Sequence, residues 1–84
     1  MSSESVMKAD QSYPLTDLPI GETARVKELR LTGNIRRRLL DIGLVEGTAV
    51  SCLYKSPAGD PTAYLIRGGV IALRAEDAVG VWVQ

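Results

Sequence analysis

The chain has 84 residues, ten basic and ten acidic side chains, no histidine and one cysteine. A chain of this length forms one domain that buries only about 60–65% of the surface of its unfolded form, which leaves little room for a deep catalytic pocket. Without histidine, and with Cys52 as its one thiol, it lacks the usual catalytic triads and the soft ligands that zinc, copper or iron prefer. We therefore expect neither an enzyme nor a bound metal or other cofactor.

The charges are unevenly distributed along the chain. Residues 25–38 hold six basic side chains and one acidic one, whereas residues 1–24 and 39–84 are each net acidic. Proteins that coat nucleic acid normally carry a strong positive charge, because phosphate neutralisation supplies most of their affinity. The zero net charge argues against nucleic acid as the partner, and the basic segment keeps a small nucleic-acid-binding barrel as an alternative.

The sequence carries no recognisable export or membrane signal. One cysteine excludes an internal disulfide framework, and no early segment joins a basic start to an apolar run. No stretch approaches the roughly 20 apolar residues that cross a bilayer. We expect a cytoplasmic protein that does not insert into a membrane itself.

The chain begins with a polar segment without periodicity. We expect residues 1–12 to form a mobile tail and residues 13–84 to form the domain. Residues 15–21 contain aspartate, proline and glycine close together, which predicts a tight turn or a single helical turn.

A first strand is predicted over residues 23–31. Its apolar residues change parity between Val26 and Leu29. Because side chains alternate between the two faces of a strand, this change requires a bulge or a sharp bend. Such devices are typical of small, strongly curved barrels.

A short helix is predicted over residues 35–42, with Asn34 as its N-cap. Gly43 then falls at the position just past the helix, where a left-handed residue is common. Leu44 and Leu39 occupy the two positions whose side chains touch in a Schellman motif. These three residues are therefore predicted to end the helix and fix it to the barrel.

The same helix has a second, more polar face. Leu40 lies between Arg36 and Arg37, away from the apolar face that contains Leu39. The simplest interpretation is a solvated helix with an incidental exposed leucine. The alternative is a partner-binding patch made of Arg36, Arg37 and Leu40, since an apolar anchor with an arginine-rich rim is typical of protein interfaces. The residues alone do not separate the two.

A β-hairpin is the clearest feature of the second half of the chain. Residues 62–67 and 70–74 have strand composition and flank Gly68 and Gly69, and two glycines suit the positive φ angles of a two-residue turn. The other elements expected here are a turn at 45–48, a strand at 48–56, a loop at 56–61, a helical turn at 75–78 and a strand at 80–84.

Cys52 and Trp82 are the candidates for a reactive thiol and for a binding surface, respectively. Cys52 shares parity with Val50 and Tyr54 in its strand, which predicts a buried, inert thiol. Trp82 is expected to cover one end of the barrel or to lie half exposed. The three tyrosines show no repeat at base-stacking spacing.

In order and spacing, four segments resemble the FeoA family, the small accessory proteins of bacterial ferrous iron uptake. The segments are LTDLPIGETARV, RRRLLDIGLVEGT, SPAGDPTAY and IRGGVIALRAEDA, and the similarity runs from about Leu15 to Val83. The resemblance implies a mainly β fold, a small five-stranded Src-homology-3-like barrel with one short helix inserted between strands 1 and 2. It also implies a partner, the membrane iron permease FeoB with its cytosolic GTP-binding domain. It implies no catalytic residue and no iron ligand.

A related domain forms the C-terminal module of iron-dependent transcriptional repressors. No winged-helix segment precedes the domain here, and a tail of 12 residues is too short for a DNA-binding domain. The expected function is therefore a protein-docking accessory of ferrous iron transport, with a metal-responsive regulatory domain as a further alternative. The sequence predicts no oligomeric state.

Overall fold

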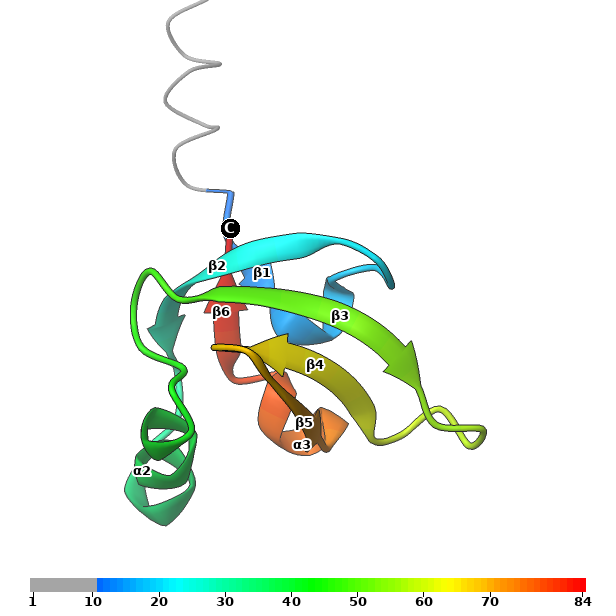
Figure 1. The fold of residues 1–84 in the computed structure, drawn as a ribbon. Helices are drawn as coiled ribbons and strands as arrows, with labels where there is room; N and C mark the ends of the chain where they lie inside the picture. The colour runs from blue at the N-terminus through cyan, green and yellow to red at the C-terminus, as the bar shows by residue number, and fades with distance from the viewer. Residues whose placement is uncertain (1–10) are drawn as a thin grey trace, which may run out of the picture.

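A computed structural model describes residues 11–84 (Figure 1). Six strands form one antiparallel sheet in the order β1-β6-β2-β3-β4-β5. The strands are β1 (Tyr13–Pro14), β2 (Thr23–Leu29), β3 (Ala49–Lys55), β4 (Thr62–Ile66), β5 (Gly69–Leu73) and β6 (Val81–Val83). The helical elements are η1 (Leu15–Asp17), α2 (Gly33–Asp41) and α3 (Ala75–Ala78).

The predicted fold class is confirmed, with one strand more than expected. The additional strand, β1, consists of Tyr13 and Pro14, which pair with Val83 and Trp82 of β6. Two residues are too few to show an alternating pattern, so sequence periodicity could not reveal this strand. The predicted helical turns at 15–21 and 75–78 are present as η1 and α3. Most of the predicted tail, residues 1–10, lies outside the described residues.

A bulge bends β2 where the sequence changes parity. Val26 pairs with Val83 of β6, but Glu28 pairs with Trp82, so Lys27 is the extra residue. One extra residue turns the following side chains to the opposite face and increases the local twist. The bend predicted within residues 23–31 is confirmed.

A second bulge, in β3, was not predicted. Cys52 pairs with Tyr64 of β4, whereas Tyr54 pairs with Ala63, which leaves Leu53 as the extra residue. Cys52 is buried as expected, but the shift at Leu53 leaves Tyr54 57% exposed, so the two do not share a face as their spacing suggested. Together the two bulges curl the sheet around its core.

The β4–β5 hairpin turns one residue earlier than expected. Ile66 pairs with Gly69, so the two turn residues are Arg67 and Gly68, with φ angles of 51° and 83°. Both values are positive, as a type I′ turn requires. The assignment of Gly68 and Gly69 as the turn is therefore wrong, because the β4–β5 register makes Gly69 the first residue of β5.

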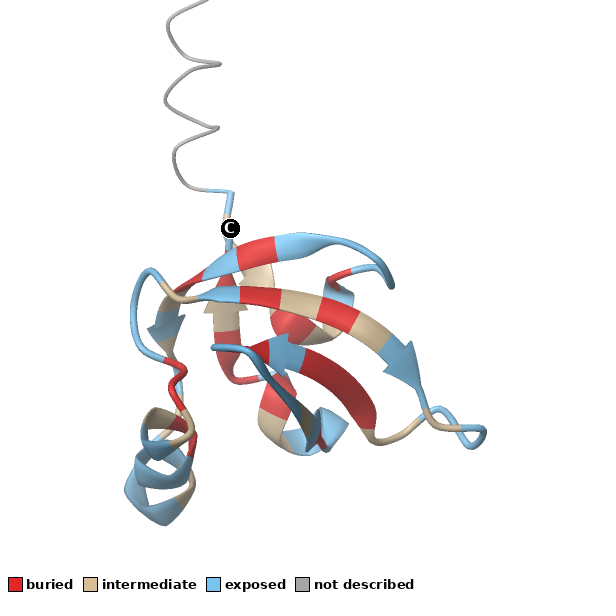
Figure 2. Ribbon diagram, viewed as in Figure 1, coloured by how far each residue is buried: buried red, intermediate tan, exposed pale blue. Residues whose placement is uncertain are grey.

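The hydrophobic core lies inside the curl of the sheet (Figure 2). Residues from every strand except β1 contribute buried side chains to it, and η1, α2 and α3 each add one. Its largest fully buried side chains are Leu15, Leu39, Leu44, Val50, Cys52, Ile66, Val81 and Val83.

Among the described residues, none of the helices has the length and apolar character needed to cross a membrane.

The turn register gives a matched pair of substitutions. We expect Gly68→Ala to lower the free energy of unfolding by about 1–2 kcal/mol, because alanine must then adopt a left-handed conformation. Gly69 lacks a positive φ, and a Cβ there would meet only the Ile66 carbonyl oxygen at 3.7 Å. Gly69→Ala should therefore change stability by less than about 0.5 kcal/mol or improve it slightly. Urea unfolding of both variants measures the difference, and equal costs would contradict the turn assignment.

Candidate docking surface

Helix α2 begins two residues earlier than predicted. Thr32 occupies the N-cap position with extended φ and ψ angles of −132° and 171°, and its side chain makes no capping hydrogen bond. Asn34 therefore lies in the first turn and is not the N-cap. The chain leaves β2 extended as far as Thr32, so the helix starts directly after it at Gly33.

The C-terminal end of α2 has the geometry of a Schellman motif. The Leu44 N–H donates to the Leu39 carbonyl oxygen at 3.1 Å, and the Gly43 N–H donates to the Leu40 carbonyl oxygen at 3.0 Å. Gly43 has a φ of 107°, and the Leu39 and Leu44 side chains are both buried. These are the two hydrogen bonds and the apolar pair that define the motif, so the chain stops the helix and enters the core within two residues.

The hairpin tip packs against this helix end. A Cβ on Gly43 would collide with Cδ of Arg67 and lie 3.2 Å from its Cγ, so the Arg67 side chain passes directly over Gly43. An arginine near a helix C-terminus also interacts favourably with the negative end of the helix dipole. Arg67 therefore connects the β4–β5 turn to α2.

Apolar contacts and one ion pair also attach the inner face of α2 to the rest of the domain. Leu39 is buried, and Ile35 and Ile42 are half-buried against the core. Nη2 of Arg38 lies 3.4 Å from Oδ2 of Asp77 in α3. An exposed ion pair of this kind adds at most about 1 kcal/mol, so apolar packing dominates the attachment.

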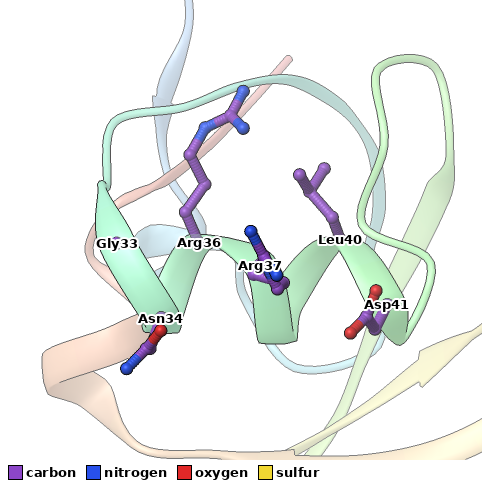
Figure 3. Close-up of a pocket in the computed structure, with 6 residues that line it drawn as sticks. All are labelled: Gly33, Asn34, Arg36, Arg37, Leu40 and Asp41. Carbon is purple, nitrogen blue, oxygen red and sulfur yellow. The ribbon is translucent and has the colours of Figure 1, made fainter.

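The opposite face carries the residues of the predicted patch. Arg36, Arg37 and Leu40, named here the α2 patch, line a shallow open hollow together with Gly33, Asn34 and Asp41. Arg36 and Leu40 project to the same side of the helix, one turn apart, as Figure 3 shows. The sequence suggested that Leu40 is exposed, but in the structure it is half-buried.

A groove between α2 and β2 explains the partial burial of Leu40. Arg36 and Leu40 line this groove from the helix side. The other lining residues are apolar Val26, Leu29 and Leu44 and charged Lys27, Glu28 and Glu46. Sequence reasoning missed these contributors from outside the helix. The parity change around Lys27 was the available signal, because it marked the bulge that lies along the groove.

The two arginines of the α2 patch keep their charges unpaired. Within residues 11–84, neither Arg36 nor Arg37 has a carboxylate at ion-pair distance. Both residues are exposed. The patch therefore combines a half-buried apolar side chain with two positive charges that are available to a ligand or partner.

The buried thiol of Cys52 and the buried hydroxyl of Tyr64 show no sign of reactivity. Burial raises the pKa of the Cys52 thiol, an effect that the positive charge of Lys55 partly opposes. Burial is also the main reason that the pKa of Tyr64 is raised. A buried neutral thiol is a poor nucleophile. Residues 11–84 contain no cluster of three or more acidic or cysteine side chains able to hold a metal ion.

Trp82 is half-buried and covered by a cation. The Arg30 guanidinium lies 3.7 Å from the centre of the Trp82 ring. Nε of Arg30 also donates to Oε2 of Glu28 at 2.7 Å. One face of the ring is thus occupied by the protein itself, and of the two expected positions for Trp82 the half-exposed one is observed.

Comparison with known proteins places this geometry in a family. The model of the FeoA domain matches residues 13–84. The chain belongs to the FeoA family. Over 70 residues it is 31% identical to a protein of Porphyromonas gingivalis named as a fusion of Fe(2+) transport protein A and the Fe(2+) transporter FeoB. The match covers 83% of this chain and 8% of the fusion protein, so the chain spans only a small part of that relative.

Solved structures of FeoA proteins share the fold. Iron(II) transport protein A of Clostridium thermocellum superimposes with a TM-score of 0.81 at 31% identity, over 84% of this chain and 44% of that one. FeoA of Stenotrophomonas maltophilia, solved with zinc and described as a prokaryotic SH3 domain protein, gives a TM-score of 0.75 at 33% identity, over 84% and 88% of the two chains. The Src-homology-3-like character expected from the sequence is thus confirmed.

The fold also occurs in regulators. A manganese-dependent transcriptional repressor superimposes with a TM-score of 0.79 at 18% identity, over 88% of this FeoA chain and 36% of that protein. At this identity the likeness concerns the fold alone.

The packing of Arg67 on Gly43 predicts a measurable coupling. We expect Gly43→Ala to lower the free energy of unfolding by about 2 kcal/mol or more, because the left-handed conformation is strained and the Arg67 stem must move. In an Arg67→Ala background the cost should fall toward the about 1–2 kcal/mol that the backbone strain alone implies. Thermal and urea unfolding of the two single variants and the double variant form the test. Strictly additive costs would show that the two residues do not interact.

Proposed function

We propose that this FeoA-family chain is a cytoplasmic accessory protein of bacterial ferrous iron transport that docks on the cytosolic GTP-binding domain of a FeoB-type permease. The observation that carries the proposal is the Porphyromonas gingivalis relative, in which a segment similar to this chain is joined to FeoB. Covalent linkage gives two domains a high effective concentration, so a fusion favours domains that act together. Two domains that act together contact each other through a surface on each.

We propose the α2 patch as that surface. A half-buried leucine with arginines around it has the composition of an interface centre, where apolar and arginine side chains are enriched. In the α2–β2 groove Val26 and Leu44 are buried, so the half-buried Leu29 and Leu40 are the apolar side chains that a partner can contact. The unpaired charges of Arg36 and Arg37 favour carboxylates around it.

The proposal assigns no reaction, metal ligand or cofactor to this chain. Ferrous iron is the cargo of the permease. The buried Cys52 and the absence of histidine leave the chain without the groups that usually bind or transform such a cargo.

The ion pairs and the hydrogen bond made by the basic side chains of residues 25–38 are evidence against a nucleic-acid interface. Three of its six basic residues are engaged: Arg30 pairs with Glu28, Arg38 pairs with Asp77, and Arg25 donates to the Gly47 carbonyl oxygen at 2.8 Å. Phosphate binding needs several free cations, because each neutralised phosphate contributes to affinity. Three free cations in residues 25–38, together with tyrosines that show no repeat at base-stacking spacing, favour a protein partner.

Leu40→Asp tests the docking proposal directly. We expect it to weaken binding to the GTP-binding domain of the cognate FeoB by more than about tenfold, because it places a charge at the apolar centre of the patch. Ile20→Asp is the matched control, since Ile20 is an exposed apolar residue outside the patch and the groove. It should bind as the parent does. Isothermal titration calorimetry with the purified domain gives the affinities.

Three further measurements complete the test. Circular dichroism establishes that the Leu40→Asp variant is folded, because Leu40 is half-buried and some loss of stability is expected. Combined Arg36→Ala and Arg37→Ala substitutions should weaken binding to the domain by several-fold as two rim charges are lost. Steeply salt-dependent binding of the parent to single-stranded RNA, abolished by the arginine substitutions, would instead favour a nucleic-acid function. Unchanged affinity in a folded Leu40→Asp variant would exclude the α2 patch.

A further inference from the structure

The two edges of the sheet are β1 and β5, and they differ in how they are protected. β1 has two residues, one of them Pro14, so it offers little to an additional strand. β5 has five residues, Gly69–Leu73, with no proline, no charged side chain and no bulge. Natural edge strands usually carry at least one of these protections against further pairing. The edge of β5 therefore lacks these protections against pairing with another strand.

The hairpin register places free backbone groups along this edge. In a two-residue hairpin the residues that flank the turn, here Ile66 and Gly69, exchange hydrogen bonds, and the bonded pairs then alternate. Val70 and Ala72 consequently direct their N–H and C=O groups away from β4. Within residues 11–84, neither residue forms a backbone hydrogen bond to another segment. Two donors and two acceptors are thus available to an added strand.

The sheet face beside this edge is apolar. Val70 is 61% exposed and pairs with Leu65, which is 38% exposed. Ala72 is also exposed, and it pairs with Ala63. A strand added along β5 would bring every second side chain against Val70 and Ala72. Apolar residues at those alternate positions would gain contact.

Charges at the two ends of β5 indicate the type of occupant. Arg67 precedes the strand and Arg74 follows it, both are exposed, and neither has an ion-pair partner among the described residues. A second copy paired antiparallel through Val70 and Ala72 would bring Arg74 of one copy next to Arg67 of the other. Like charges at both ends of the pairing oppose such a dimer. Asp60 and the exposed Glu76 lie beside Arg74, so a carboxylate is favoured at the Arg67 end of an occupant.

We infer that the edge of β5 binds an extended segment of a partner protein, in which apolar residues alternate and a carboxylate lies at the end of the paired stretch next to Arg67. The segment adds a further antiparallel or parallel strand to the sheet. This site is separate from the α2 patch, and the inference stands whether or not α2 binds a GTP-binding domain.

A synthetic peptide tests the inference. The probe is the capped heptapeptide Glu-Val-Thr-Val-Thr-Val-Glu, titrated into the isotopically labelled full chain. We expect saturable amide shift changes centred on Val70 and Ala72. A peptide N-methylated at the edge-facing positions should bind at least about tenfold more weakly, since hydrogen bonds are lost. A peptide with lysine in place of both glutamates should also bind several-fold more weakly.

Variants of the protein complete the test. Ala72→Pro removes an outward N–H that makes no bond to β4, so the hairpin should persist while peptide affinity falls by about tenfold. Ala72→Ser retains the N–H and serves as the control. The inference is overturned if the parent gives no shifts up to millimolar peptide or if shifts arise elsewhere. It is also overturned if N-methylation has no effect. Self-association through β5 without peptide would identify a second copy as the occupant and exclude the partner segment.

Discussion

The turn at Gly43 is the constraint on which the position of α2 depends. Gly43 adopts a conformation that other residues reach only with strain, and its N–H and that of Leu44 close the helix. Leu39 before the turn and Leu44 after it are both buried in the core. The two side chains therefore hold the end of the helix against the barrel. With Leu39 and Leu44 buried on the inner side, Arg36 and Arg37 of the α2 patch remain exposed.

Two bulges give the sheet the curvature that surrounds this anchor. The extra residue Lys27 turns β2 after the first half of the strand, and Leu53 does the same for β3. The first bulge also shapes the proposed docking surface, because Lys27 and Glu28 line the groove beside Leu40. The bulge at Lys27 therefore both bends β2 and contributes residues to the candidate surface.

Local stereochemistry made much of the fold predictable. The parity change after Val26 indicated a bulge, and the spacing of Leu39, Gly43 and Leu44 indicated a C-cap, because both signals act within a few residues. The hairpin was found, but its turn was misplaced by one residue. Arg67 gave no sign that it would adopt a positive φ, and cross-strand pairing decided the register.

The candidate surface was less predictable because it depends on tertiary contacts. The helical pattern grouped Arg36, Arg37 and Leu40, but the α2–β2 groove combines residues from separate segments of the chain. The partial burial of Leu40 and the packing of Arg67 over Gly43 likewise follow from the tertiary fold. No periodicity within one element reports on such contacts.

The most direct test of the docking account is a solution NMR titration of the labelled chain with the unlabelled GTP-binding domain of its cognate FeoB. The account predicts that amide signals of Arg36, Arg37 and Leu40, and those of the adjoining residues Lys27 and Glu28, shift or broaden first and saturate together. Signals around Ile20 should change little, since Ile20 lies outside the α2 patch and the groove. Saturable changes confined to residues outside α2 and β2, or no change at millimolar domain, would contradict it.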